Sequence, residues 1–213
     1  MRKFFLFVIV LACLVACGAG HQFNALSANA NVVILGDSLT YGTGAAHGED
    51  YVTLLTAETG WKIMNAGVPG NTSADGLSRL DELLASHDEG AQKIDLLIVE
   101  LGGNDFIKKI PEAETIRNLN EILAQTKARN IQTVLIAIPE FSPISAAFGN
   151  LEDHPLYKKL ANETNTPLVE NIFSDVLAKN SLKSDPIHPN AQGYRLVANE
   201  LKAALSDFGF LKN

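Results

Sequence analysis

Five apolar runs of strand length are spaced along the chain. Val, Ile and Leu follow one another within these runs instead of alternating with polar residues, a pattern typical of strands that are covered on both faces. The stretches that contain the runs are Asn31–Ser38, Trp61–Gly67, Ile94–Asp105, Thr133–Pro139 and Thr166–Asn171. These five stretches are therefore predicted to form the strands of one sheet.

The segments between the strands, and the tail from Ala191 to Phe208, place aliphatic residues at helical spacing. The periodic positions are Leu77, Leu80 and Leu84, then Ile116, Leu119 and Leu123, and finally Val197, Leu201 and Leu205. Alternation of strands and helices implies right-handed crossovers between parallel strands. We therefore expect an α/β fold, a three-layer α/β/α sandwich around a central, mostly parallel, five-stranded sheet.

Polar clusters follow three of the predicted strands. In open parallel sheets, ligands bind beyond the carboxyl ends of the strands, and the clusters Gly36–Ser38, Gly102–Asp105 and Pro139–Glu140 stand at those ends. Ser38 can serve there as the cap of the following helix or as a nucleophile facing a crevice. The choice depends on whether the chain also supplies a base, a group that orients it and donors for an oxyanion.

Composition indicates an ordinary globular protein, with 46% hydrophobic and 19% charged residues among 213. No long linker or repeat divides the chain, so residues 32–213 are predicted to form a single domain. A net charge of −7 without a basic stripe argues against nucleic acid as a partner. The sequence contains no H-E-x-x-H, Cys/His cluster, phosphate-binding loop or G-x-S-x-G motif, so no metal or cofactor is expected.

The first seventeen residues have the pattern of an export signal. Arg2 and Lys3 precede an apolar run from Phe4 to Val15, which is shorter than the roughly 20 residues of a membrane span. The run leads into "LVAC", which resembles the lipobox of bacterial lipoprotein signals and predicts acylation of Cys17. Residues 18–31 would then be a tether. An ordinary cleaved signal that happens to contain a cysteine is the alternative.

Cysteine usage agrees with a lipid anchor. Cys13 lies inside the predicted signal and would be removed with it, which leaves Cys17 as the only thiol. A single cysteine forms no internal disulfide, whereas acyl chains on it would hold the protein to a membrane. The expected location is the bacterial cell envelope, facing the periplasm or at the outer membrane, because Gly18 is not the Asp-type signal for inner-membrane retention. The oligomeric state is not indicated by the sequence.

One of the five histidines has an acid placed to orient it. His188 stands in "SDPIHPN", three residues after Asp185, and prolines at 186 and 189 stiffen the turn. A carboxylate that accepts the Nδ1 proton leaves Nε2 free for a serine hydroxyl. An Asx turn followed by a helix near Asn190 explains the same residues without chemistry. The other histidines, His21, His47, His87 and His154, are expected to be surface or loop residues.

Two glycine-containing segments offer hydrogen-bond donors to an anion. Asn104 in "GGND" ends the longest apolar run, and the glycines before it allow close approach of a ligand to the backbone. "GVPGNTS" follows the second predicted strand and supplies another backbone N–H. A plain turn accounts for either segment taken alone.

The motifs "GDSLTYG", "GVPGNTS", "GGND" and "DPIHP" resemble, in order and spacing, those of the SGNH (GDSL-type) hydrolases. The nearest resemblance is to the bacterial periplasmic esterase/thioesterase/lysophospholipase L1 (arylesterase) branch, which implies a flavodoxin-like sheet and no metal. Carried over by motif, Ser38 is the nucleophile, and Asp185 and His188 complete the triad. The oxyanion hole is the Ser38 amide, the Gly70 amide and the Asn104 side chain, with Gly67 as a nearby alternative to Gly70.

The resemblance implies a serine esterase that hydrolyses carboxylic esters through an acyl-enzyme intermediate. Apolar residues in the segments 141–155 and 106–111 favour aryl, short-to-medium acyl or lysophospholipid-like substrates, small-molecule or lipid esters. A carbohydrate O-deacetylase and a non-catalytic, lipid-anchored binding protein are the alternatives. Asp37, Asp105 and Glu100 are expected to support the loops around the site.

Overall fold

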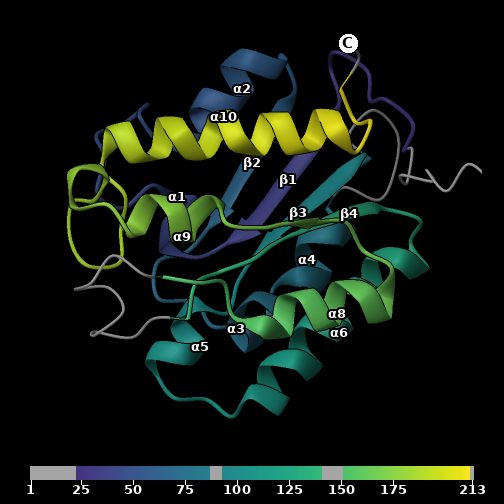
Figure 1. The fold of residues 1–213 in the computed structure, drawn as a ribbon. Helices are drawn as coiled ribbons and strands as arrows, with labels where there is room; N and C mark the ends of the chain where they lie inside the picture. The colour runs from purple at the N-terminus through teal and green to yellow at the C-terminus, as the bar shows by residue number, and fades with distance from the viewer. Residues whose placement is uncertain (1–22, 87–92, 141–150, 212–213) are drawn as a thin grey trace, which may run out of the picture.

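Five parallel strands form one sheet in the order β2-β1-β3-β4-β5 (Figure 1). The computed structural model describes residues 23–86, 93–140 and 151–211. The strands are β1 (Asn31–Gly36), β2 (Lys62–Gly67), β3 (Leu96–Glu100), β4 (Gln132–Ile136) and β5 (Leu168–Val169). The predicted five-stranded sheet is confirmed, and every pairing in it is parallel.

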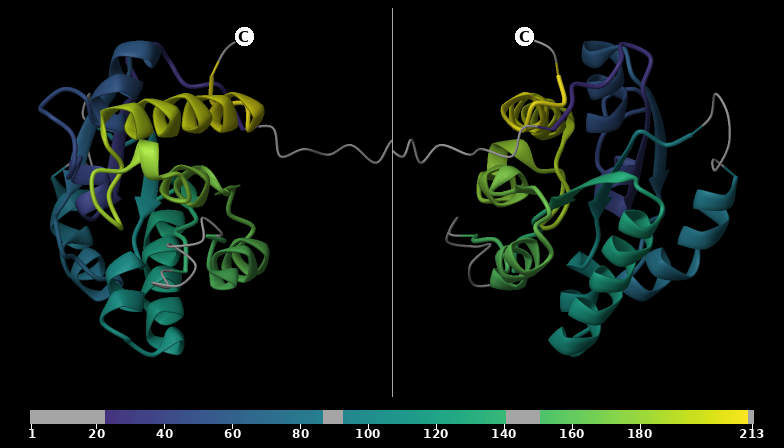
Figure 2. Two further views of the ribbon diagram at one scale, coloured as in Figure 1. Left: turned by 60° about the vertical axis from the view of Figure 1, so that its left-hand side comes forward. Right: turned by 90° about the vertical axis from the view of Figure 1, so that its right-hand side faces the viewer.

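Helices cover both faces of the sheet and give the expected three layers (Figures 1 and 2). One face carries α2 (Tyr51–Thr59), α9 (Ile172–Leu177) and α10 (Ala191–Asp207). The other carries α3 (Ser73–Ser78), α4 (Leu80–Ala85), α6 (Glu112–Ala128) and α8 (Pro155–Thr164). The short helices α1 (Ser38–Tyr41), α5 (Gly103–Ile107) and η2 (Asn180–Leu182) lie in the connections.

Strand position decides how deeply each apolar run is buried. All five residues of β3, in the middle of the sheet, are buried, and the interior of β1 is buried as well. The edge strand β2 has a neighbour on one side only, and Met64 within it is 41% exposed. The expectation of cover on both faces therefore holds for the central strands and is wrong for β2.

The periodic leucines from 77 to 84 lie on two short helices instead of one. The backbone of Arg79, with φ −101° and ψ 0°, leaves the helical conformation between α3 and α4. Leu80 and Leu84 are still fully buried, because the break keeps the apolar side of both helices against the sheet. The C-terminal helix follows its prediction closely, and α10 ends one residue before Phe208.

The described chain begins near the end of the sheet at which the strands start. Phe23 stacks on Phe210 with ring centroids 4.8 Å apart, and its backbone N–H donates to the carbonyl of Phe208. The Leu26 N–H donates to the carbonyl of Phe210 in the same way. This part of the predicted tether thus packs beside the end of α10 (Figure 2). The predicted signal and Cys17 lie outside the described residues.

Candidate active site

The end of β1 delivers Ser38 to the crevice. β1 and β3 are neighbours in register, with Gly36 opposite Glu100, and their connections leave toward opposite faces of the sheet. Such a switch point is where open parallel sheets form a ligand crevice. The cap of α1 is Asp37, whose Oδ1 accepts a hydrogen bond of 3.0 Å from the Leu39 N–H. Because Asp37 fills the capping role, the Ser38 hydroxyl is free for another partner.

Three side chains from distant parts of the chain meet at this position. The Ser38 Oγ lies 2.9 Å from Nε2 of His188, and Nδ1 of the same ring lies 2.7 Å from Oδ2 of Asp185. The His188 side chain is 13% exposed and the Asp185 side chain is 45% exposed. Although partial burial opposes it, hydrogen bonds from Ile187 and His188 lower the pKa of Asp185, so this acid is ionised at neutral pH.

The loop that carries Asp185 and His188 is an Asx turn as well as the source of two aligned side chains. Oδ1 of Asp185 accepts from the N–H groups of Ile187 and His188, at 2.9 and 3.0 Å, and this leaves Oδ2 for the imidazole. The carbonyl of His188 accepts from the Ser184 N–H across the base of the loop. Both interpretations of this motif therefore apply: Oδ1 of Asp185 forms the Asx turn, and Oδ2 faces the imidazole of His188.

Hydrogen-bond donors surround the space next to Ser38. Gly70 adopts φ +82°, a left-handed conformation that favours glycine. Within the described ranges, neither the Ser38 N–H nor the Gly70 N–H donates to another group. The Gly67 N–H, in contrast, donates to Oδ1 of Asn65. Of the two glycines considered from sequence, Gly70 is thus the one with an available N–H.

Asn104 is held in place by two acceptors. Its Nδ2 donates to Oδ2 of Asp37 at 2.8 Å and to the carbonyl of Asn71 at 2.9 Å. Asn104 therefore joins the loop after β2 to the turn that carries Ser38. Both amide hydrogens are engaged, so an oxyanion at this site would share one of them with Asp37 or with Asn71.

Two buried acids lie directly behind the Ser38 turn. Burial raises the pKa of Asp37 to about 6, against the opposing hydrogen bonds from Leu39 and Asn104. Burial, together with the nearby charge of Asp37, raises the pKa of Glu100 well above its usual value. Oε2 of Glu100 accepts from the backbone N–H groups of Asp37 and Thr40 and from the Thr40 hydroxyl. Glu100 thus supports the turn without touching the crevice.

Arg79 also holds the site, although it belongs to no sequence motif. Arg79 donates to the side chain of Asn71 and to the backbone carbonyls that end β1 and β2. A basic residue between the periodic leucines of a helix resembles any solvent-facing position, so its sequence carried no signal. His154, expected from the sequence to be a surface or loop residue, caps α8 and stacks on Phe106 with ring centroids 4.4 Å apart.

An apolar pocket opens beside Ser38 and His188. Seven aliphatic or proline side chains contribute to its wall: Leu39, Ile107, Ile138, Pro139, Leu151, Leu177 and Ile187. Such a surface suits the hydrocarbon part of a substrate whose reacting carbonyl lies at Ser38. Of the two segments predicted to line it, 106–111 contributes Ile107 and 141–155 contributes Leu151, while residues 141–150 lie outside the described ranges.

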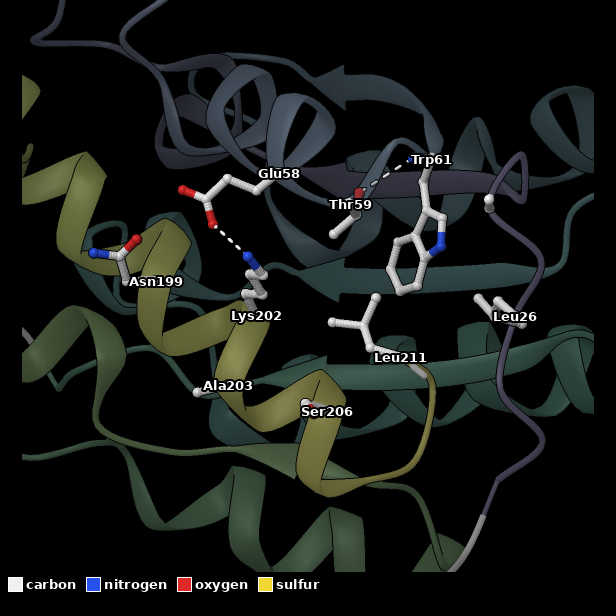
Figure 3. A pocket seen from close by; sticks show the side chains of 10 residues that line it. Leu26, Glu58, Thr59, Trp61, Asn199, Lys202, Ala203, Ser206 and Leu211 are labelled. Carbon is white, nitrogen blue, oxygen red and sulfur yellow. Dashed lines mark hydrogen bonds and ion pairs between the residues drawn. The ribbon is translucent and has the colours of Figure 1, made fainter. Parts of the chain in front are cut away.

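Another pocket lies at the opposite edge of the sheet and has different chemistry. Figure 3 shows it between α10 and the start of β2, with Leu26, Trp61 and Leu211 on one side and the ion pair of Glu58 and Lys202 on the other. Among the residues that the structure describes, no histidine lines this pocket. The aligned hydroxyl, imidazole and carboxylate thus belong to the crevice at Ser38.

The described residues form neither a metal-binding cluster nor a membrane-spanning helix. No three His, Cys, Asp or Glu side chains in these ranges are grouped so that they could hold a metal ion. No helix in the same ranges combines the length and the apolar character needed to cross a bilayer.

Comparison with known proteins assigns the family. The sequence profile of the GDSL-like Lipase/Acylhydrolase family matches residues 34–196. The chain belongs to this family. The thioesterase 1/protease 1/lysophospholipase L1 of Escherichia coli K12 is 31% identical over 201 residues, which cover 92% of this chain and 87% of that protein. The arylesterase of Vibrio mimicus is 26% identical over 180 residues, covering 82% and 87% respectively.

The fold agrees with that of an esterase of known structure. The psychrotrophic esterase EstA from Pseudoalteromonas sp. superposes with a TM-score of 0.72 at 25% identity, covering 84% of this chain and 98% of that one. The protein described here is accordingly an ester hydrolase of the GDSL/SGNH type.

Proposed function

We propose that Ser38 is the nucleophile and His188 the general base in the hydrolysis of carboxylic esters by this protein. The observation that carries the proposal is the 2.9 Å contact between the Ser38 hydroxyl and Nε2 of His188. This contact is within the range needed for proton transfer during attack on a carbonyl. Asp185, bonded to the other ring nitrogen, fixes the tautomer and stabilises the imidazolium that forms.

The reaction proceeds in two halves. Oγ of Ser38 bonds to the carbonyl carbon while its proton moves to His188, and the carbonyl oxygen becomes an oxyanion. The amides of Ser38 and Gly70 and the Asn104 side chain donate to that oxygen. Collapse of the tetrahedral intermediate expels the alcohol, which takes the proton from His188. A water molecule, deprotonated by His188, then attacks the acyl-enzyme. The acid leaves as Oγ of Ser38 takes that proton back from His188.

The apolar wall supports esters with an aryl or aliphatic acyl group as substrates. Ile138, Leu151 and Leu177 would pack against the hydrocarbon part of such esters, whereas an acetylated sugar would present hydroxyl groups to them. This favours aryl, short-to-medium acyl and lysophospholipid-like esters over a polysaccharide O-acetyl group. Acetylated glycans remain the comparison substrate in the test.

A chain-length series of p-nitrophenyl esters, measured beside acetylated xylan, tests the proposal. Wild-type protein is compared with Ser38→Ala and with Ser206→Ala, a serine on the last turn of α10. We expect Ser38→Ala to lose at least about 10³-fold in kcat and Ser206→Ala to match the wild type. Stoichiometric labelling by a fluorophosphonate should map to Ser38. Retained hydrolysis in Ser38→Ala would overturn the assignment, and a preference for acetylated xylan would overturn the substrate class.

We further propose that the protein is a lipoprotein of the bacterial cell envelope, anchored through Cys17. The support is the charged start, the short apolar run and the "LVAC" sequence that ends in Cys17. Mass spectrometry of the mature N-terminus from a bacterial host tests this, with Cys17→Ser as the control. We expect diacylglycerol on Cys17 in membranes and release of the variant from them. An unmodified mature Cys17 contradicts the proposal.

A further inference from the structure

Arg79 links three segments of the chain behind the crevice. It stands between α3 and α4, and its side chain reaches the end of the sheet at which the strands stop. Nη2 donates to the carbonyl of Gly36 at 2.9 Å and to the carbonyl of Ala66 at 2.7 Å. Nε donates to Oδ1 of Asn71 at 3.0 Å. One guanidinium thus joins the end of β1, the end of β2 and the loop after β2.

Each acceptor of Arg79 stands close in sequence to one of the donors proposed for the oxyanion. Gly36 comes two residues before Ser38, and Asn71 directly follows Gly70. Asn71 also accepts, through its own carbonyl, the hydrogen bond from Asn104. Arg79 is therefore linked to Asn104 by hydrogen bonds through Asn71, and its acceptors Gly36 and Asn71 lie within two residues of Ser38 and Gly70 along the backbone.

Arg79 serves hydrogen bonding here and makes no ion pair. No Asp or Glu among the described residues lies within 4.0 Å of its guanidinium, and its three acceptors are two carbonyls and one amide oxygen. Burial of the half-exposed side chain lowers the pKa of Arg79. The nearby charge of Asp75 opposes this shift but lies beyond ion-pair distance, so the planar fork of donors is what offsets the lost hydration.

We propose that Arg79 is a positioning residue that sets the spacing of the oxyanion donors at Ser38, Gly70 and Asn104. The inference rests on the proposed function, because it assumes that the carbonyl oxygen of the ester lies between those donors. Arg79 does not touch the substrate. Its effect belongs to the transition state, where the oxygen becomes negative and donor geometry matters most.

Lysine cannot take the place of arginine at this position. An ammonium group is a compact charge on a flexible stem, and it cannot donate from two nitrogens in the fixed directions that Gly36, Ala66 and Asn71 require. Arg79→Lys keeps the charge and most of the apolar stem. It therefore separates the geometric role of Arg79 from its charge and its packing.

Steady-state kinetics on a p-nitrophenyl ester test the proposal with Arg79→Lys, Arg79→Met and the control Arg117→Met. Arg117 lies on the exposed side of α6 and pairs with Glu114. We expect both Arg79 variants to lose between about 10- and 10³-fold in kcat, because misplaced donors approach the effect of a lost donor. KM should change less than threefold, and Arg117→Met should match the wild type. A loss that falls on KM, or an unchanged kcat in Arg79→Lys, overturns the proposal.

A double-mutant cycle with Asn71→Ala separates positioning from a general effect on folding. Asn71→Ala removes the side-chain link to Arg79 and keeps the backbone carbonyl that accepts from Asn104. Since both changes break the same link, Arg79→Lys combined with Asn71→Ala should lose little more kcat than the worse single variant. Losses that multiply would show two independent effects and overturn the proposal. All assays are run well below each variant's thermal midpoint.

Failure of this inference is distinguishable from failure of the proposed function. If Ser38→Ala retains hydrolysis, the nucleophile assignment is wrong, whatever the Arg79 variants do. If Ser38→Ala is inactive while Arg79→Lys keeps the full kcat, the nucleophile stands and the positioning role is wrong. The pH profile of kcat/KM in Arg79→Lys should keep the wild-type shape, because the contact between His188 and Asp185 is untouched. A displaced profile would indicate a wider structural change and contradict the positioning role.

Discussion

Asp37 Oδ2 accepts a hydrogen bond of 2.8 Å from the Asn104 side chain, and the other oxygen of Asp37 caps the helix that begins with Ser38. The carboxylate thus connects the turn that carries Ser38, the proposed nucleophile, to Asn104, a proposed oxyanion donor. Both oxygens act as acceptors, which the ionised form does best. A proton on either oxygen weakens one of the two bonds.

This arrangement predicts an acid limb of activity that belongs to Asp37. Because its pKa is raised to about 6, kcat should fall as pH decreases through that value and Asn104 loses its acceptor. In Asp37→Asn one of the two bonds faces a donor at every pH, so kcat should be reduced by about 10- to 100-fold, and the part of the acid limb that Asp37 contributes should vanish. Profiles of kcat from pH 4.5 to 8 measure this. Wild-type and variant profiles of the same shape would contradict it.

The same shift makes stability depend on pH. The ordinary pKa of Asp37 is 3.8 and the folded value is about 6, so the folded state binds the proton first as pH falls. The contribution of Asp37 to stability is therefore present below about pH 4 and lost as pH rises through about 6. Urea unfolding should show that the stability of Asp37→Asn relative to wild type increases as pH rises from about 4 to about 6. Above about pH 6 this difference should not increase further. A difference that stays constant with pH would refute the shift.

Asp185→Asn is expected to reduce kcat by up to about 10⁴-fold with little change in folding. The variant retains an oxygen for the N–H groups of Ile187 and His188, so the turn persists. Its amide replaces the acceptor that faces Nδ1, which favours the tautomer unable to take a proton from Ser38. Asp207→Asn, on the last turn of α10, is the control. Retention of more than a tenth of wild-type kcat would exclude the orienting role.

Gly36→Ala should disrupt the turn before the nucleophile. A Cβ at this position would lie 2.0 Å from Oγ1 of Thr40 and 2.7 Å from Oε2 of Glu100. Relief of these contacts requires moving Thr40 or Glu100, at a cost of about 1–3 kcal/mol in the free energy of unfolding. Gly48→Ala, whose Cβ would meet no atom within 4 Å, serves as the comparison: its positive φ strains the backbone but leaves kcat unchanged. Equal kcat in the two variants would contradict the steric argument.

Asp105→Ala should be among the most destabilising single changes outside the catalytic residues. The fully buried Asp105 accepts hydrogen bonds from the backbone and hydroxyl of Ser73 and from the hydroxyl of Thr115. Its removal leaves these donors unpaired in the interior, at a cost of about 3 kcal/mol. The exposed Asp175 of α9 provides the control, with an expected change within about 0.5 kcal/mol. Urea denaturation compares the two, and equal midpoints would contradict the prediction.

The sequence predicted the fold well where burial and periodicity coincide. β3 and α10 appear where their patterns indicate, because the strand is covered on both faces and the helix on one. The exposed edge position of β2 was missed, since the run around Met64 has the same composition as a central strand. The break at Arg79 was missed because Leu80 and Leu84 keep their spacing across it.

Linear motifs led to the side chains of the crevice but not to what supports them. Asp185 and His188 are three residues apart in one loop, so their contact can be anticipated from spacing. The division of roles between Asp37 and Ser38 depends on which side chain turns back to the helix, and spacing does not encode this. The contact of Arg79 with Gly36 joins residues 43 positions apart, and no local pattern predicts such a pairing.

Because the strands are parallel, the two ends of the sheet differ: all strands begin at one end and stop at the other. Phe23, stacked against the far end of α10, enters where the strands begin, while Ser38 opens where they end, about 20 Å further along a six-residue strand. The six residue steps from Cys17 to Phe23 span at most about 20 Å. An attachment to the chain before Phe23 would therefore hold the protein at the end of the sheet where the strands begin. The crevice at Ser38 would then face away from the point of attachment and be open to diffusing substrate.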